Sequence, residues 1–257
     1  MALRRFYFEH PIQGEQVQIG GDLFHHIRDV CRFAVGDRFE LLAGDQQAWL
    51  VEIQSLDKRE MSTRVVSKRT LPELPRPWIT LALSVPKLPK VDWIIEKCVE
   101  LGVREIRPFV SDHSFLRKTS ELSENRVQRW QKLSRAATQQ SGRGDLMRIE
   151  PAVTLANLLE EFNRSPEAGG LFPYEGEAQL SLKEALTALR QKRPLRQIWV
   201  FVGSEGGFSQ DEVALFARHG LSPVSMGEQI LRVETACVAL VSVIKYEYEQ
   251  FEYGSIR

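Results

Sequence analysis

Cysteine is scarce in this sequence, with three residues (Cys31, Cys98 and Cys237) in a chain of 257. The three are widely separated and odd in number, and no CxxC pair or Cys/His cluster occurs. These features argue against a disulfide scaffold and against a zinc site. Cys98 and Cys237 lie in stretches where apolar residues recur at helical spacing, so we expect both to be core residues.

Long hydrophobic runs are also missing. The longest, around residues 236–244, is about half the length needed to span a bilayer. The N-terminal MALRRFYFEH has two arginines but no apolar segment behind them, which is not the pattern of a signal peptide. The sequence therefore predicts a cytoplasmic protein with no membrane partner. Its 43% apolar and 26% charged content is ordinary for a globular chain.

The formal net charge is zero, because 34 Lys and Arg residues balance 34 Asp and Glu residues. The average hides an asymmetry along the chain. Residues 104–148 hold ten basic against five acidic side chains, whereas residues 203–257 hold four against eight. A polarised surface can steer a polyanion even when the net charge is zero. The excess of basic side chains in residues 104–148 is therefore compatible with an RNA partner.

The first 71 residues have the pattern of a small β-barrel domain. Short β-branched or aromatic runs are separated by Gly/Asp turns, and one helix-like segment at Asp22–Cys31 interrupts them. The expected strands cover residues 4–8, 38–43, 47–54 and 60–67. Residues 72–77 hold three prolines in six positions, which predicts a stiff interdomain linker.

Residues 78–257 alternate between strand and helix patterns and are expected to form a second, α/β domain. Such alternation implies a mostly parallel sheet with helices on both faces and a ligand site at the carboxyl ends of the strands. The expected strands cover residues 78–84, 105–110, 168–173, 197–202 and 221–225, and the expected helices cover 90–101, 123–140, 154–163, 181–192, 209–219 and 233–249.

The most informative segment is the first loop, residues 203–208, which follows the strand-like run IWVFV. Three glycines in five residues predict a sharp turn that approaches a ligand closely. A dinucleotide fingerprint would need glycine at Glu205, and a P-loop would need Lys-Ser/Thr where Phe208-Ser209 stands. A carboxylate there would repel phosphate, so the expected ligand lacks phosphates or is cationic. The alternative is a turn without a function.

The second loop, residues 225–235, has Gly227 followed by the apolar pair Ile230-Leu231 where a surface loop would be polar. Apolar residues beside Arg232 and Glu234 suggest a wall against which a flat ring packs. The alternative is a helix entry in which Leu231 fills the core and Arg232 pairs with a surface acid. Two such loops side by side would suit a small nucleoside-bearing cofactor.

Five segments together resemble the bacterial 16S ribosomal RNA uracil-N3-methyltransferases of the SPOUT superfamily. They are residues 203–213 (GSEGGFSQDEV), residues 226–236, residues 90–102, the Gln-Gln-Ser-Gly-Arg segment at 139–143, and residues 25–37. The chain departs from the family pattern in three places. Ser204 replaces a usual proline, Asp112-His113-Ser114 stands where Glu-Arg-Ser is common, and Cys31-Arg32 replaces Leu-Arg.

The resemblance implies an α/β SPOUT domain threaded into a trefoil knot, behind a PUA-like β-barrel that binds RNA. It also implies S-adenosylmethionine as cofactor, a homodimer, and small-subunit ribosomal RNA as partner. Methyl transfer from a sulfonium requires no metal, so none is expected. The expected cofactor-binding residues are Leu171, Phe172, Gly203, Glu205, Gly206, Gly207, Met226, Gly227, Ile230 and Leu231.

Uracil N3 is protonated at neutral pH and becomes a good nucleophile once that proton leaves. Arg232 is the candidate for stabilising the resulting anion, facing the uracil carbonyl oxygens. Glu205 or Glu234 could accept the proton, although Glu205 could instead brace its loop. These three are the expected catalytic residues.

RNA contacts are expected from cations in both domains. The candidates are Arg4, Arg5, His25, Arg28, Arg32, Arg117, Lys118, Arg126, Arg129 and Arg143. A solvated basic face is the alternative for those on the helix at 123–140.

Rival functions are a ribose 2′-O- or tRNA-base methyltransferase of the same superfamily and a non-catalytic RNA-binding protein. The absence of a dinucleotide-binding glycine fingerprint at residues 203–208 argues against a nicotinamide dehydrogenase.

Overall fold

A computed structural model describes residues 3–165, 167–178, 180–191 and 194–251, and the chain divides into two compact units. The first comprises the residues up to Glu73 together with Arg135–Leu146, and the second comprises Leu74–Ser134 and the chain from Met147 on. The sequence assigned residues 135–146 to the second domain. They pack with the first unit because the Tyr7 N–H donates to the Gln139 side-chain oxygen at 2.6 Å and the Gln46 N–H donates to the Gly144 carbonyl at 3.3 Å.

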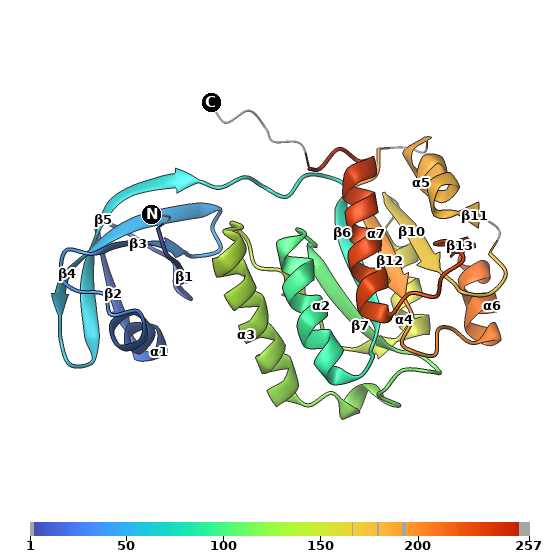
Figure 1. Ribbon diagram of the computed structural model, residues 1–257, viewed down its shortest axis with the longest axis horizontal. Helices are drawn as coiled ribbons and strands as arrows, with labels where there is room; N and C mark the ends of the chain where they lie inside the picture. The colour runs from blue at the N-terminus through green and yellow to red at the C-terminus, as the bar shows by residue number, and fades with distance from the viewer. Residues whose placement is uncertain (1–2, 166, 179, 192–193, 252–257) are drawn as a thin grey trace. The chain divides into compact units, whose positions relative to one another are not determined.

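The first unit is built on a five-stranded sheet of order β1-β3-β4-β5-β2 (Figure 1). Its strands are β1 (Arg5–Tyr7), β2 (Gln16–Gly20), β3 (Arg38–Leu42), β4 (Gln47–Leu56) and β5 (Glu60–Thr70). Pairing is antiparallel except between β1 and β3. The helix α1 (Gly21–His25) continues into a π-helical turn at His26–Val30. Phe24, Ile27 and Phe39 are fully buried in its core.

The sheet of the second unit is parallel throughout, with the order β11-β13-β10-β12-β6-β7-β8 and β9 paired to β7. The strands are β6 (Trp78–Ser84), β7 (Glu105–Val110), β8 (Arg148–Ile149), β9 (Val153–Thr154), β10 (Ala168–Pro173), β11 (Leu180–Ser181), β12 (Gln197–Val202) and β13 (Pro223–Ser225). The mixed α/β class expected from the sequence is confirmed.

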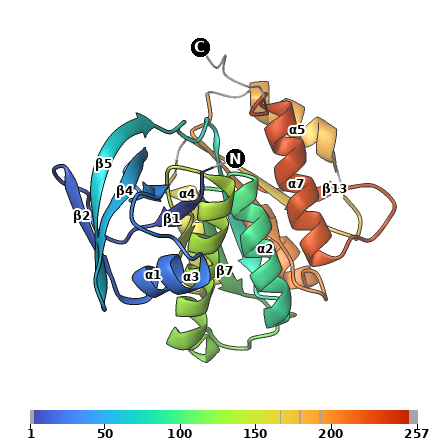
Figure 2. The same ribbon diagram turned by 60° about the vertical axis from the view of Figure 1, so that its left-hand side comes forward.

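Among the described residues, six α-helices follow the pattern expected for the second domain closely. They are α2 (Leu88–Glu100), α3 (Glu124–Ser141), α4 (Leu155–Asn163), α5 (Leu182–Gln191), α6 (Gln210–Arg218) and α7 (Val233–Glu247). The helices α2 and α7 pack side by side (Figures 1 and 2). Among the described residues, no helix is both long and apolar enough to cross a bilayer.

An aromatic core holds the first loop in place. Phe172 on β10 stacks on Phe216 of α6 with ring centroids 4.2 Å apart, and both rings are fully buried. Phe208, which ends the first loop, packs edge-on against Phe216 at 4.9 Å. The loop is therefore anchored at its carboxyl end by burial of a large apolar ring.

Candidate cofactor cavity and catalytic site

The first loop connects β12, which ends at Val202, to α6. Within it, the Gly207 N–H donates to the Ser204 carbonyl at 3.0 Å, and Gly207 has φ +64°. A Cβ on Gly203 would lie 3.1 Å from the Gly207 backbone. The positive φ of Gly207 favours glycine there, and the close backbone approach makes a side chain at Gly203 tight. Ser209 begins α6 with a capping box that includes Glu212.

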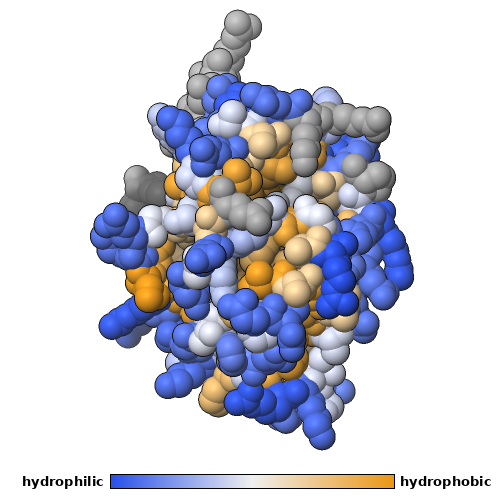
Figure 3. Space-filling model, turned by 90° about the vertical axis from the view of Figure 1, so that its right-hand side faces the viewer, coloured by the Kyte–Doolittle hydropathy of each residue, from blue (hydrophilic) through white to orange (hydrophobic). Residues whose placement is uncertain are grey.

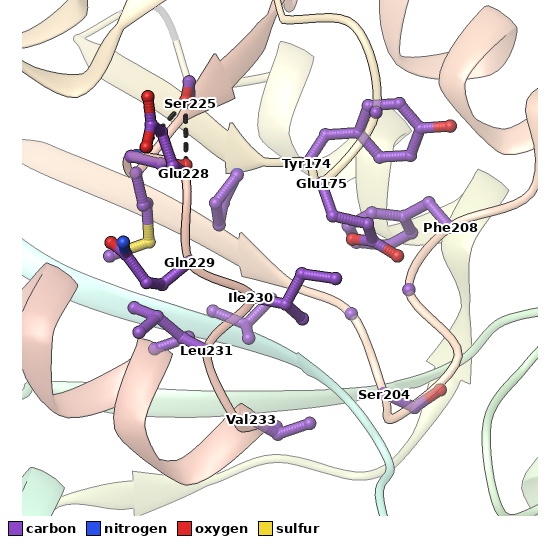
Figure 4. Close-up of a pocket in the computed structure, with 18 residues that line it drawn as sticks. Tyr174, Glu175, Ser204, Phe208, Ser225, Glu228, Gln229, Ile230, Leu231 and Val233 are labelled. Carbon is purple, nitrogen blue, oxygen red and sulfur yellow. Dashed lines mark hydrogen bonds between the residues drawn. The ribbon is translucent and has the colours of Figure 1, made fainter.

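The second loop begins at the end of β13. Gly227 has φ +111°, and its N–H donates to the Ser225 hydroxyl at 3.2 Å (Figure 4). The helix α7 starts at Val233, with Arg232 at the N-cap. Because β10, β12 and β13 are parallel, the segments that follow them meet at one edge of the sheet.

A cavity of about 260 Å³ lies between these segments. Figure 4 shows Tyr174, Glu175 and Phe208 on one side and Gln229, Ile230 and Leu231 on the other. Its described lining includes the carboxylates Glu175 and Glu228 but no Lys, Arg or His. The cavity thus suits a partly apolar ligand that is neutral or cationic, and it disfavours phosphate.

The structure brings six of the expected cofactor residues to this cavity. They are Gly203, Gly207, Met226, Gly227, Ile230 and Leu231. Leu171 and Phe172 are buried within β10, and residues 173–176, which follow them, line the cavity instead. Gly206 also lies outside the lining, and a Cβ there would be 2.8 Å from the His113 Cβ.

The lining residues that were not expected from the sequence include Tyr174, Glu175 and Gly176. The available signal was the Glu-Gly pair directly after the strand at 168–173, in the position that the first loop occupies after β12. Placing the ligand beyond the strand end rather than on it would have found them.

The carboxylates of Glu205 and Glu234 lie outside the cavity lining and contact Lys90. Both carboxylates lie 3.3 Å from the Lys90 ammonium nitrogen, and the Lys87 N–H also donates to Glu205 at 3.2 Å. Partial burial raises the pKa of Glu205, but backbone hydrogen bonds and the Lys90 ammonium outweigh this, so the pKa lies below that of an ordinary glutamate. Burial lowers the pKa of Lys90, and the two carboxylates reverse this and leave it raised.

Arg232 is exposed, and within the described part of the chain its side chain has no ion pair or hydrogen-bond partner. The alternative in which it pairs with a surface acid is therefore not seen there. Ile230 is 83% exposed and Leu231 is half-buried, so neither residue fills the core. The second loop instead presents an apolar wall and an unpaired cation.

The RNA-binding candidates fall into two groups. Five arginines are already engaged within the chain, and His25 lies 3.1 Å from Asp29. The arginines and their partners are Arg5 with Glu40, Arg28 with Asp29, Arg129 with Asp92, Arg143 with Asp145, and Arg117 with the Asp112 carbonyl. In the part of the chain that the structure describes, four candidate side chains have no such partner, namely Arg4, Arg32, Lys118 and Arg126.

Comparison with known proteins gives two family matches. A model of the RNA methyltransferase domain matches residues 72–245, and a model of the RNA methyltransferase PUA domain matches residues 19–66. The matches follow the order of the two units along the chain.

Individual relatives agree with these matches. The ribosomal RNA small subunit methyltransferase E of Synechocystis sp. is 31% identical over 221 residues, which is 85% of this chain and 69% of that protein. Its Bacillus subtilis counterpart is 28% identical over 90% of each chain. A crystal structure of the Neisseria gonorrhoeae counterpart, bound to S-adenosyl methionine, has a TM-score of 0.82 at 25% identity and covers 95% of this chain and 98% of that chain.

The matched domain covers more than half of the sequence, and the cavity lies within it. The chain therefore belongs to the RNA methyltransferase family, among the ribosomal RNA small subunit methyltransferase E proteins.

Proposed function

We propose that this chain transfers a methyl group from S-adenosylmethionine to N3 of a uridine in small-subunit ribosomal RNA. The observation that carries the proposal is the cavity between the two loops, whose described lining offers carboxylates and no basic side chain. The relatives with this name support the RNA substrate, and the Neisseria gonorrhoeae structure supports the cofactor.

The lining residues fit S-adenosylmethionine. Ile230, Leu231 and Val233 supply apolar surface for a flat ring, and Glu175 and Glu228 supply negative charge for a cationic ligand. When bound, the cofactor supplies a methyl group on a positively charged sulfur. Of the other expected residues, Leu171 and Phe172 are buried in β10 and Gly206 lies outside the lining, whereas Glu205 contacts Lys87 and Lys90 at the start of α2.

Arg232 is the proposed catalytic residue. It stands at the N-cap of α7, a position where Ser, Thr, Asp or Asn is usually preferred. The positive end of the helix dipole adds to its charge, so this point attracts an anion strongly. Stabilising the N3 anion by two pKa units would supply about 2.7 kcal/mol, or roughly a hundredfold in rate.

The two carboxylates are weaker candidates for accepting the N3 proton. The lowered pKa of Glu205 makes it a poorer base than an ordinary glutamate. Glu234 shares the same lysine and also lies in the first turn of α7, where a negative charge is stabilised. We assign Glu205 to structural support and keep Glu234 as the candidate proton acceptor.

We also propose that the active form is a homodimer in the cytoplasm, where ribosomal RNA is available. Figure 3, which views the side of α5 and α6 in Figure 1, shows apolar surface gathered in the middle of that face. The second unit also exposes large apolar side chains on α2 and α7. Trp93 on α2 is 42% exposed and Tyr246 on α7 is 77% exposed. A second copy covering α2 and α7 would remove this surface from water. The trefoil knot implied by the resemblance stays a prediction.

Ribosomal RNA from a strain lacking this chain should lose 3-methyluridine from the small subunit, because this chain is the proposed enzyme that adds that methyl group. Nucleoside mass spectrometry measures the loss, and re-expression of the chain is the control. Loss of a 2′-O-methylated nucleoside instead would overturn the assignment of N3.

Replacing Arg232 with alanine should lower the single-turnover methylation rate by about a hundredfold, since the charge that stabilises the N3 anion is gone. Affinity for S-adenosylmethionine should change little, because Arg232 is outside the cavity lining. Arg218→Ala, an exposed arginine on α6, is the matched control. A loss smaller than tenfold would remove Arg232 from the chemistry.

Glu175→Gln should weaken binding of cationic S-adenosylmethionine by about fivefold relative to neutral S-adenosylhomocysteine, as expected for a largely exposed charge pair. Isothermal titration calorimetry with both ligands gives the ratio. Glu177→Gln is the control, because Glu177 is exposed nearby but does not line the cavity. An unchanged ratio would show that Glu175 does not face the sulfonium.

Arg126→Ala and Arg32→Ala should each reduce the slope of log affinity against log salt by about 0.7–0.9, as expected when one phosphate contact is lost. Filter binding of a small-subunit ribosomal RNA fragment at several salt concentrations measures the slope. Arg164→Ala, which removes an exposed cation paired with Glu160, should leave the slope unchanged. Equal slopes for all three variants would place RNA elsewhere.

A further inference from the structure

Lys90 lies in the first turn of α2 and has two acidic partners from distant parts of the chain. Its ammonium nitrogen is 3.3 Å from the Glu205 carboxylate and 3.3 Å from the Glu234 carboxylate. The three side chains are only 27%, 33% and 23% exposed. Partial burial makes such contacts stronger than those of fully exposed pairs.

The two carboxylates belong to the two sides of the cavity. Glu205 directly follows Ser204, which lines the cavity from the first loop. Glu234 directly follows Val233, which lines it from the start of α7. Neither glutamate is itself in the lining. Lys90 therefore connects the two walls from outside the space that a ligand would fill.

The connection has a second point of attachment. The Lys87 N–H, at the N-cap of α2, donates to the same Glu205 carboxylate at 3.2 Å. The start of α2 thus binds the first loop through both a backbone donor and an ammonium group. Since α2 also packs on α7, one rigid helix contacts both sides of the cavity.

Electrostatics gives Lys90 a further role. Glu205 and Glu234 carry like charges and lie close to the same nitrogen, so without the ammonium they would repel each other. Such repulsion would act directly on the spacing between the two loops. The lowered pKa of Glu205 and the raised pKa of Lys90 agree with an ion pair between these two residues that stays charged at neutral pH.

We propose that Lys90 is a positioning residue that sets the distance between the two loops and thereby determines affinity for S-adenosylmethionine. The inference rests on the proposed function, because it takes the cavity as the cofactor site. It also extends to Arg232, because this residue stands between Leu231 and Val233, which both line the cavity. Loss of Lys90 should therefore affect both cofactor binding and the rate of methyl transfer.

Calorimetry with S-adenosylmethionine on the full chain tests the proposal. Lys90→Met should raise the Kd about tenfold, and Lys90→Arg, which keeps the charge, should recover most of the affinity. Lys97→Met is the matched control, because Lys97 lies on the same helix and its ion pair in the described structure is with Glu100, three positions along the chain. Its Kd should equal that of the wild type.

RNA affinity measured without the cofactor separates positioning from direct contact. It should be the same for Lys90→Met and the wild type. A Lys90→Met variant that binds S-adenosylmethionine normally, or that loses RNA affinity while keeping cofactor affinity, would overturn the proposal. Failure of the wild type itself to bind the cofactor would instead count against the proposed function.

Neutral glutamate variants keep the test valid if Lys90→Met does not fold. Glu205→Gln and Glu234→Gln each remove one ion pair but leave the lysine and the backbone contacts. In a double-mutant cycle, Glu205→Gln and Glu234→Gln should be non-additive in log Kd, because both glutamates pair with the same lysine. Additive effects would show that the two residues act independently and would contradict the connection.

Discussion

The close approach of Gly203 and Gly207 across the turn after β12 is the constraint on which the cavity depends. A Cβ on Gly203 would lie 3.1 Å from the Gly207 backbone, and the positive φ of Gly207 would strain any other residue. Phe208, buried against Phe216, fixes the other end of the loop to the core. A short segment between a buried strand and a buried ring has little freedom, so its backbone groups are held ready for a ligand.

Charge is separated around this turn in a way that matches the proposed chemistry. Carboxylates lie in the described lining of the cavity, where a cationic methyl donor would be stabilised. The cations Lys90 and Arg232 lie outside that lining. Lys90 forms ion pairs with two glutamates, whereas the Arg232 side chain is exposed and has no partner among the described residues. A paired cation is suited to holding structure, and an unpaired one is suited to meeting an anion that forms during the reaction.

Much of the second unit was predictable because its elements are long and strongly patterned. Apolar runs and helical spacing predict the strand at 197–202 and the helix at 233–249, and the structure has β12 at 197–202 and α7 at 233–247. The strand β2 was missed because Gln16–Gly20 holds only two apolar residues, and β8, β9 and β11 are two residues long. The placement of residues 135–146 with the first unit depends on contacts with Tyr7 and Gln46, which no local pattern reveals.

By itself, the sequence determined the two-part organisation, the parallel α/β class and the two loops, because glycine content and hydrophobic period are local properties. The resemblance to the uracil-N3-methyltransferases predicted the identity of the cofactor and of the RNA target. Tertiary structure alone decided which residues face the cavity: it buried Phe172, brought Glu175 against Gly207 and placed Glu205 and Glu234 on Lys90. The physical reason is that these contacts join residues far apart in the chain, and their partners are set by strand order and helix packing rather than by neighbours in sequence.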